Sequence, residues 1–372
     1  MDSQITFEFV PTEWFDENAI KLPNYRVGRI NFGKGRSYIK INQDGTLGHP
    51  FKLYTSLTTS IAQSMPTPIQ LEDWKFQHGK KEADRLMRVA ASYGTLMHME
   101  IGRFIKDKCY DLDGIDAVIE DYLSKISFWD DDCKWWNSKL KEDILAFVQF
   151  YNDYEVIPLG LEYVLVSDKY CFGTPIDLVC MLTVTEDGLD YDDPYKTGHR
   201  KGEPREVKIR VQKRAIINFK SGRKGFYETH GIQMECERLL WDENFPESPI
   251  DIAMNWAPAE WKTNPGYKIK EWQDVYGKEE IEAILKLAEI RYRDKAEKRK
   301  YMTISGVISS SDSVASAIKF EFVEDYCNRK FGNTPSVPQK RTAISGKPNN
   351  NPIPKLIIPP AANIVGGVLL NW

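Results

Sequence analysis

The 372-residue chain lacks several features that would place it in a protein class at once. No apolar run approaches the ~20 residues of a membrane-spanning helix, and the first ten residues, MDSQITFEFV, do not form a signal peptide. We therefore expect a protein that stays in the cytoplasm, or in the host cytoplasm if a virus encodes it, with no membrane partner. The formal net charge of −4 argues against a generally basic nucleic-acid coat protein.

Cysteine is scarce and widely spaced. None of the six cysteines forms a CxxC pair; they are Cys109, Cys133, Cys171, Cys180, Cys236 and Cys327. This spacing excludes a zinc ribbon and an iron–sulfur cluster of the usual pattern. We expect reduced thiols that are mostly buried.

Apolar periodicity predicts an α/β fold with a mixed central β-sheet flanked by helices. The expected helices are 69–106, broken in two at Gly94, then 139–156, 226–243 and 278–301. The expected strands are 52–61, 160–168, 172–184, two strands within 207–222, and 250–256, with an acidic loop at 186–193.

Composition divides the chain into three parts. Residues 1–68 form a β-rich lead-in, residues 69–302 form the core with an N-terminal helical region and an insertion near 110–137, and residues 303–372 form a C-terminal extension. From about Gly332 the extension is rich in Pro and Asn, yet it ends in the apolar stretch LIIPPAANIVGGVLLNW. We expect this end to dock on the chain itself or on a protein partner.

Three short motifs carry candidate chemistry. They are His98 in GTLMH on a helix, Asp177 in GTPID at the start of an apolar strand, and Asn218 with Lys220 in INFKSG. Residues two apart on a strand share one face. Oxygen ligands on such a face, with the backbone carbonyl of Phe219, suit Mg²⁺ or Mn²⁺, and a lysine beside them can position water and offset phosphate charge.

The order GTLMH, GTPID and then NFK before a glutamine-bearing helix resembles the motif order of the RecB-like branch of the PD-(D/E)xK nucleases. The upstream stretches YTSLTTSIAQSM and LEDWKFQHGKKEADRLMRVAASYGTLMH are similar to those of phage-type and mitochondrial genome maintenance exonucleases. The similarity covers roughly residues 50–245. It implies a restriction-endonuclease-like core and a Mg²⁺- or Mn²⁺-dependent deoxyribonuclease, an exonuclease rather than an endonuclease, acting in phage or cellular replication, recombination or repair.

The resemblance also implies roles for individual residues. Asp177 would be the central metal ligand, with position 218 and the Phe219 carbonyl beside it, and His98 would bind the metal or orient the phosphate. Glu162 loosely matches an acidic position on the preceding strand.

Two further side chains match the family's catalytic pair. Lys220 would be the catalytic lysine, and Gln233 would contact that lysine or the substrate. The four-cysteine iron–sulfur pattern of some relatives is absent from this sequence.

One position departs from the pattern, because Asn218 stands where the family has Asp or Glu. Asn carries no charge and binds a divalent ion more weakly. Three explanations are open: an engineered Asp→Asn variant, which we favour at this point, a naturally inactive relative, or an acid that has moved to Glu237, one helical turn after Gln233.

The tripeptide Glu206-Val207-Lys208 also fits (D/E)xK. Basic residues alternate along the sequence that follows it, as in an edge strand or hairpin. We therefore place the catalytic site at Asn218 and Lys220 and keep Glu206 only as the weaker candidate.

Local charge favours DNA as the partner, single-stranded or with free ends. Residues 195–224 contain eleven Lys/Arg and two Asp/Glu, a local net charge of +9, and we assign phosphate contacts to Lys213, Arg214, Arg223 and Lys224. The alternative is a solvated hairpin balanced by the acidic loop 186–193. Trp129, Trp135 and Trp136 could stack on bases or simply pack. A catalytically silent DNA-binding or assembly protein is the rival to the enzyme.

Overall fold

The computed structural model describes residues 5–9, 13–15, 20, 22–32, 35–47, 51–126, 131–223, 225–272, 275–297, 300–304, 309 and 318–331. The C-terminal stretch 332–372, whose apolar end we expected to dock, lies outside the described residues. None of the described helices is long and apolar enough to span a bilayer.

Ten strands of the described chain form one mixed sheet, in the order β1-β3-β4-β5-β7-β8-β9-β10, with β6 between β2 and β7. Two neighbouring pairs are parallel, β5 with β7 and β8 with β9, and the others are antiparallel. The strands are β1 (Ile5–Phe9), β2 (Glu13–Trp14), β3 (Tyr25–Phe32), β4 (Gly35–Asn42), β5 (Tyr54–Ser56), β6 (Ile157–Ser167), β7 (Phe172–Asp190), β8 (Arg205–Phe219), β9 (Ile252–Pro258) and β10 (Tyr267–Glu271).

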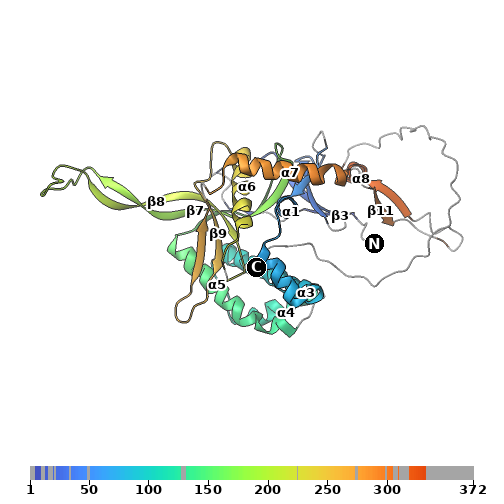
Figure 1. Cartoon of the computed structure of the whole chain (residues 1–372), viewed down its shortest axis with the longest axis horizontal. Coiled ribbons are helices and arrows are strands. Elements are labelled where there is room, and N and C mark those ends of the chain that lie inside the picture. The colour runs from blue at the N-terminus through green and yellow to red at the C-terminus, as the bar shows by residue number, and fades with distance from the viewer. Residues whose placement is uncertain are drawn as a thin grey trace.

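Helices cover both faces of this sheet, which confirms the predicted fold class (Figure 1). They are α1 (Leu57–Ser64), α2 (Ile69–His78), α3 (Lys80–Asp107), α4 (Ile115–Ile126), the 3₁₀ turn η1 (Asp131–Trp135), α5 (Trp136–Asp153), α6 (Glu228–Asn244), α7 (Lys278–Glu297) and α8 (Val323–Phe331). A separate two-stranded sheet contains β11 (Lys300–Ile304) and β12 (Ile318–Phe322).

The core has two layers because side chains along the central strands point alternately to the two faces of the sheet. One face of β7, β8 and β9 contributes Leu178, Ile217 and Trp256 to a cluster with α3, α4 and α5. The other face contributes Val179 and Ile216 to a cluster with α1, α6 and α7. Strand β9 is buried along its whole length, as a strand covered on both faces must be.

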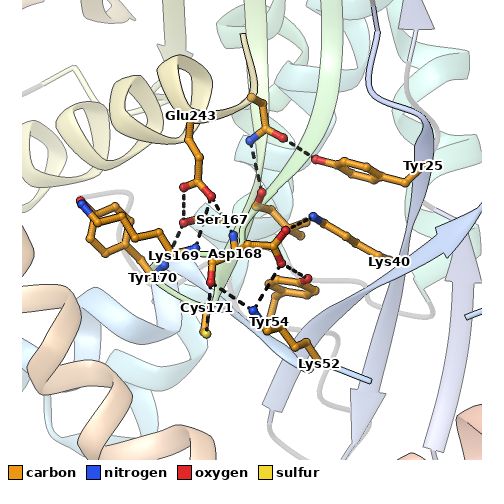
Figure 2. Close-up of polar contacts among 12 residues, drawn as sticks. Tyr25, Lys40, Lys52, Tyr54, Ser167, Asp168, Lys169, Tyr170, Cys171 and Glu243 are labelled. Carbon is orange, nitrogen blue, oxygen red and sulfur yellow. Dashed lines mark hydrogen bonds and ion pairs between the residues drawn. The ribbon is translucent and has the colours of Figure 1, made fainter. Parts of the chain in front are cut away.

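Hydrogen bonds at the β6–β7 turn connect the N-terminal strands to the core (Figure 2). Asp168 accepts hydrogen bonds from Lys40 Nζ at 2.5 Å and Tyr54 Oη at 2.6 Å, and Glu243 of α6 accepts the Asp168 backbone N–H at 2.9 Å. Residues 1–68 therefore contribute strands to the same sheet as the core.

Four sequence expectations were wrong. The predicted strand 52–61 is a three-residue strand followed by α1, and the helical stretch 69–106 breaks at Gly79, whose φ of 74° suits glycine, whereas Gly94 is buried inside α3. Residues 205–219 form one long strand, and the predicted acidic loop is largely part of β7, because the two strands pair continuously from Leu178↔Ile217 to Asp190↔Arg205. None of the six cysteines, all of them in the described residues, forms a disulfide, and four are buried, as expected.

Gly231 allows close packing between α6 and the buried Trp272. A Cβ at Gly231 would lie 2.3 Å from the Trp272 ring, whereas a Cβ at Gly102 would meet only the flexible Leu161 side chain at 3.1 Å. We predict that Gly231→Ala lowers the free energy of unfolding by about 1–3 kcal/mol. Gly102→Ala, with the same gain in helix propensity, should change it by less than about 1 kcal/mol. Urea unfolding measures both, and equal stability of the two variants would contradict this packing.

Candidate active site

The site begins where the β7–β8 ladder ends. The last paired residues are Leu178 and Ile217, and at the next position the Asp177 carboxylate takes over from the backbone: its Oδ2 accepts the Phe219 N–H at 2.7 Å. The GTPID turn therefore fixes Asp177 beside the last residues of β8. This hydrogen bond holds the carboxylate between the ends of two strands.

His98 and Glu162 approach Asp177 from two other elements. His98 Nδ1 lies 3.7 Å from Asp177 Oδ2 and 3.9 Å from Glu162 Oε1, while its Nε2 lies 3.1 Å from the carbonyl oxygen of Phe219. One atom each of His98, Glu162 and Asp177 lies within 4.8 Å of the others, an arrangement that can hold a metal ion.

Glu162 reaches this cluster through an unusual backbone. It lies between the cross-strand pairs Leu161↔Leu178 and Tyr163↔Ile176, directly across from Asp177, with a φ of 49°. A non-glycine residue in the left-handed region costs about 1–3 kcal/mol, and such strain concentrates at functional sites. The structure thus brings the loosely matched Glu162 into the cluster.

The lysine side of the site is formed by β8 and α6. Lys220 Nζ donates to Gln233 Oε1 at 3.1 Å, and Gln233 Nε2 donates to Glu237 Oε1 at 2.7 Å. Asn218 Nδ2 lies 3.5 Å from the same Glu237 oxygen. Asn218, Lys220 and Glu237 are all buried, and Glu237 Oε2 has no hydrogen-bond partner among the described residues.

Burial and crowding of charge shift the pKa values of this site. Burial, with Glu162 adding to it, raises the pKa of Asp177 to about 6, although His98 and Lys220 oppose the shift. Burial and the nearby Asp177 raise the pKa of Glu237 to about 8. Burial lowers the pKa of Lys220 against the attraction of both carboxylates. Burial alone would lower the pKa of His98, but Asp177 and Glu162 outweigh it and the pKa rises.

A network that the sequence analysis missed fixes the segment after Lys220. Lys139 Nζ donates to the Ser221 carbonyl at 3.2 Å and to Asp143 at 2.5 Å, and Arg223 binds Asp143 at 2.7 Å. Tyr93 Oη donates to the same carboxylate at 2.6 Å. The sequence signal for this network was Asp143, a carboxylate at a core-facing position of the predicted helix 139–156.

A second missed contact supports Asn218 from behind. Asn255 of β9 lies beside Asn218 in the parallel register and donates to its carbonyl at 3.4 Å, and Trp272 Nε1 donates to Asn255 Oδ1 at 2.7 Å. The sequence signal for this contact was Asn255, the one amide side chain within the apolar strand IAMNWAP.

The structure separates most of the predicted basic stretch from this site. Residues 205–212 lie on the outer part of β8, and Arg205 is roughly 40 Å along the strand from Asn218. Glu206, the weaker (D/E)xK candidate, lies there too and pairs with Arg200 at 3.0 Å. It therefore cannot act with Asp177.

The four predicted DNA contacts have different surroundings. Lys213 pairs with Glu186 at 2.9 Å, Arg214 donates to the Pro249 carbonyl at 3.1 Å, and Arg223 is engaged by Glu142 and Asp143. Lys224 lies outside the described residues.

The three tryptophans also differ. Trp136 is fully buried and packs in the core, Trp135 keeps 41% of its surface exposed, and Trp129 lies outside the described residues. Packing therefore accounts for Trp136, and Trp135 alone of the described pair is open to a stacking partner.

The donor set of the site fits a divalent cation. Two carboxylates, one imidazole and one backbone carbonyl converge, and oxygen-rich sets of this kind suit Mg²⁺ or Mn²⁺. The raised carboxyl pKa values show that burial outweighs the positive charge of His98 and Lys220, and Glu237 Oε2 has no hydrogen-bond partner among the described residues.

We predict a pH-dependent stability effect at Glu237. Its pKa is raised from about 4.5 to about 8, so the folded state keeps a proton that the unfolded state releases between these pH values. Stability therefore falls as pH rises through this window. Glu237→Gln, which cannot ionise, should unfold at a temperature several degrees higher than the parent at pH 8 in EDTA, and at a nearly equal temperature at pH 5. Glu228→Gln, at an exposed position of the same helix, is the control; a difference that does not vary with pH would contradict the prediction.

Comparison with known proteins adds no relative. No protein-family model matches the chain, and no curated protein matches it. The resemblance to the PD-(D/E)xK nucleases therefore rests on the sequence motifs alone.

Proposed function

We propose that the chain is a divalent-metal-dependent phosphodiester hydrolase, a DNA exonuclease of the RecB-like PD-(D/E)xK type. The observation that carries the proposal is the convergence of His98, Glu162 and Asp177 within 4.8 Å, next to the Phe219 carbonyl at the end of β8, which Lys220 directly follows. The three sequence motifs are far apart in the chain, and a nuclease requires them together.

The chemistry assigned to each residue follows from its surroundings. Mg²⁺ or Mn²⁺, when bound, would supply Lewis acidity toward water and phosphate. His98, Asp177 and Glu162, with the Phe219 carbonyl, would hold the ion. The hydrogen bond from Lys220 to Gln233 fixes the direction of the amino group, and burial makes its proton easier to lose. Lys220 is therefore suited to orient the attacking water and to stabilise negative charge on the phosphate.

Among the three explanations for Asn218, the contacts favour the moved acid. Glu237 lies within 3.5 Å of Asn218, shares Gln233 with Lys220 and is fully buried. Its carboxylate can supply the charge that position 218 lacks. We therefore assign Glu237 the part of the second acid and revise the preference for an engineered substitution.

The substrate and the biological setting are proposed from the family resemblance. The substrate is DNA, single-stranded or with free ends, and the setting is replication, recombination or repair in the cytoplasm, including that of a phage-infected host. The terminal stretch 332–372 remains a candidate contact for a protein partner.

A catalytically silent DNA-binding or assembly protein is the second candidate. Asn218 favours it, because an amide at the family's acidic position weakens metal binding. The two candidates differ in whether labelled DNA is cut.

We predict that the parent chain degrades end-labelled linear DNA with Mg²⁺ or Mn²⁺ and leaves closed circular DNA intact. Glu237→Gln should lower the rate by a hundredfold or more, because catalysis at such a site is largely electrostatic. Asn218→Asp should change the rate by less than about tenfold.

The outcomes separate the explanations. Retained cutting by Glu237→Gln, with strong activation by Asn218→Asp, would show that the acid has not moved. Absence of cutting by all forms, Asn218→Asp included, would favour the silent binder. Glu228→Gln serves as the matched control, and cleavage of closed circles would indicate an endonuclease.

We also predict that DNA affinity depends on the base of the β7–β8 hairpin. Lys213 and Arg214 lie roughly 15 Å along β8 from Asn218, within reach of a bound strand. Replacing both by Ala should reduce the slope of log affinity against log salt by about one unit for each phosphate group that the variant no longer neutralises. Lys208→Ala, farther out and paired with Asp187, should leave the slope unchanged. Equal slopes for all forms would remove this stretch from the DNA footprint.

A further inference from the structure

The stretch between β8 and α6 joins the two members of the Lys220–Gln233 pair. Phe219 packs in the core cluster on one face of the sheet, and Phe226 packs against the cluster on the other face. Between these two rings the sequence KSGRKG offers no apolar side chain. Polar contacts therefore determine the path of this stretch. We call residues 220–223 the connector.

Two hydrogen bonds hold the backbone around Lys220. The Lys220 N–H donates to the Trp256 carbonyl at 2.8 Å, which continues the parallel pairing of β8 with β9. Lys139 Nζ of α5 donates to the Ser221 carbonyl at 3.2 Å. These two contacts lie before and after the Lys220 Cα, so together they set the direction in which the Lys220 side chain leaves the backbone.

Lys139 is itself held in place. Its Nζ lies 2.5 Å from Asp143 Oδ2 and 4.0 Å from the centroid of the Tyr93 ring, and Tyr93 Oη donates to the same Asp143 oxygen at 2.6 Å. Arg223 donates to the other Asp143 oxygen at 2.7 Å, so the fully buried carboxylate also holds the far end of the connector. The network thus transmits the position of α5 to the connector.

A gain in stability does not explain a buried ion pair at this position. Asp143 lies on the core-facing side of α5 with Leu140, Ile144 and Phe147, which are all buried. Burial of two opposite charges costs free energy that their attraction only partly offsets, and apolar replacements of such pairs are often as stable. The pair is better suited to fixing the geometry of the residues that it contacts.

We infer that Lys139 and Asp143 are positioning residues of the proposed reaction: through the Ser221 carbonyl they fix the direction in which Lys220 reaches the phosphate. The inference rests on the proposed function. Neither side chain has to touch the substrate. A shift of about 1 Å in a group that acts on the reacting atoms can lower a rate about a hundredfold, so loss of this support should affect cleavage more than DNA binding.

The double substitution Lys139→Met with Asp143→Asn tests the inference. It removes both charges together, and Arg223 keeps Glu142 as a partner at 2.7 Å, so no buried charge is left alone. We expect kcat for Mg²⁺-dependent cutting of end-labelled linear DNA to fall at least about thirtyfold, with KM within about threefold of the parent. The unfolding temperature should change by only about a few degrees. If this variant does not fold, Lys139→Met alone takes its place, because Asp143 then keeps Arg223 and Tyr93.

The matched control is Glu100→Gln with Arg103→Met. Glu100 is also a buried carboxylate that binds a tyrosine hydroxyl, Tyr110 Oη at 2.6 Å, and a cation of its own helix, Arg103 at 3.0 Å. None of its described contacts is with the connector. The control should keep kcat within about threefold of the parent. Hydrogen exchange of the connector should be faster in the Lys139 and Asp143 variant and unchanged in the control.

The outcomes separate this inference from the proposed function. A parent that cuts no DNA overturns the proposed function and, with it, the reaction that these residues would serve. In a parent that cuts, an unchanged kcat or unchanged exchange of the connector in the test variant overturns the inference alone. An equal fall of kcat in the control would indicate a general loss of packing, and a rise of KM without a fall of kcat would indicate a substrate contact; either result also overturns it.

Discussion

The hydrogen bond from the Phe219 backbone to the Asp177 carboxylate is the contact on which the rest of the site depends. It fixes the register of β7 against β8 at the point where their ladder ends. A slip of one residue would reverse the face of every side chain on β8. Lys220 would then leave Gln233, and the Phe219 carbonyl would leave His98. The same register continues through the outer pairing of β7 with β8, as far as Asp190↔Arg205.

The acids of the site are held at a cost to folding. Both Asp177 and Glu237 are buried, Asp177 raises the pKa of Glu237, and Glu162, held by a left-handed backbone, raises the pKa of both. Structural ion pairs would relieve such crowding, as they do around Asp143, where Lys139 and Arg223 neutralise the carboxylate. At the proposed site the described cations are fewer than the acids, and a divalent ion is the counter-charge that the arrangement suits. The buried acids therefore lower the stability of the folded protein at the proposed active site.

Sequence patterns predicted the layers of the fold and the motifs of the site, because both rest on local spacing. The apolar alternation of 172–184 and the 3.6-residue period of 139–156 each identify a buried face. Asn218 and Lys220 share a face by strand geometry alone. Tertiary effects account for the failures: α3 continues through Gly94 because residues on both sides of it, such as Tyr93 and Met97, pack in the core, and β8 stays a single strand because β7 pairs with it. Some ion pairs of the basic stretch join residues across the hairpin, as Lys213 with Glu186 and Lys208 with Asp187 do, and composition cannot show them. Asp143 and Asn255 were missed because their partners are remote in sequence.

The central claim is that His98, Glu162 and Asp177 form a divalent-cation site beside Lys220. Anomalous diffraction from crystals soaked in Mn²⁺ tests it most directly, because it locates the ion without requiring activity. The account predicts a single strong peak bound by Asp177 and His98 with the Phe219 carbonyl nearby, and its loss in Asp177→Asn. A peak elsewhere, or one that survives that substitution, would contradict the account.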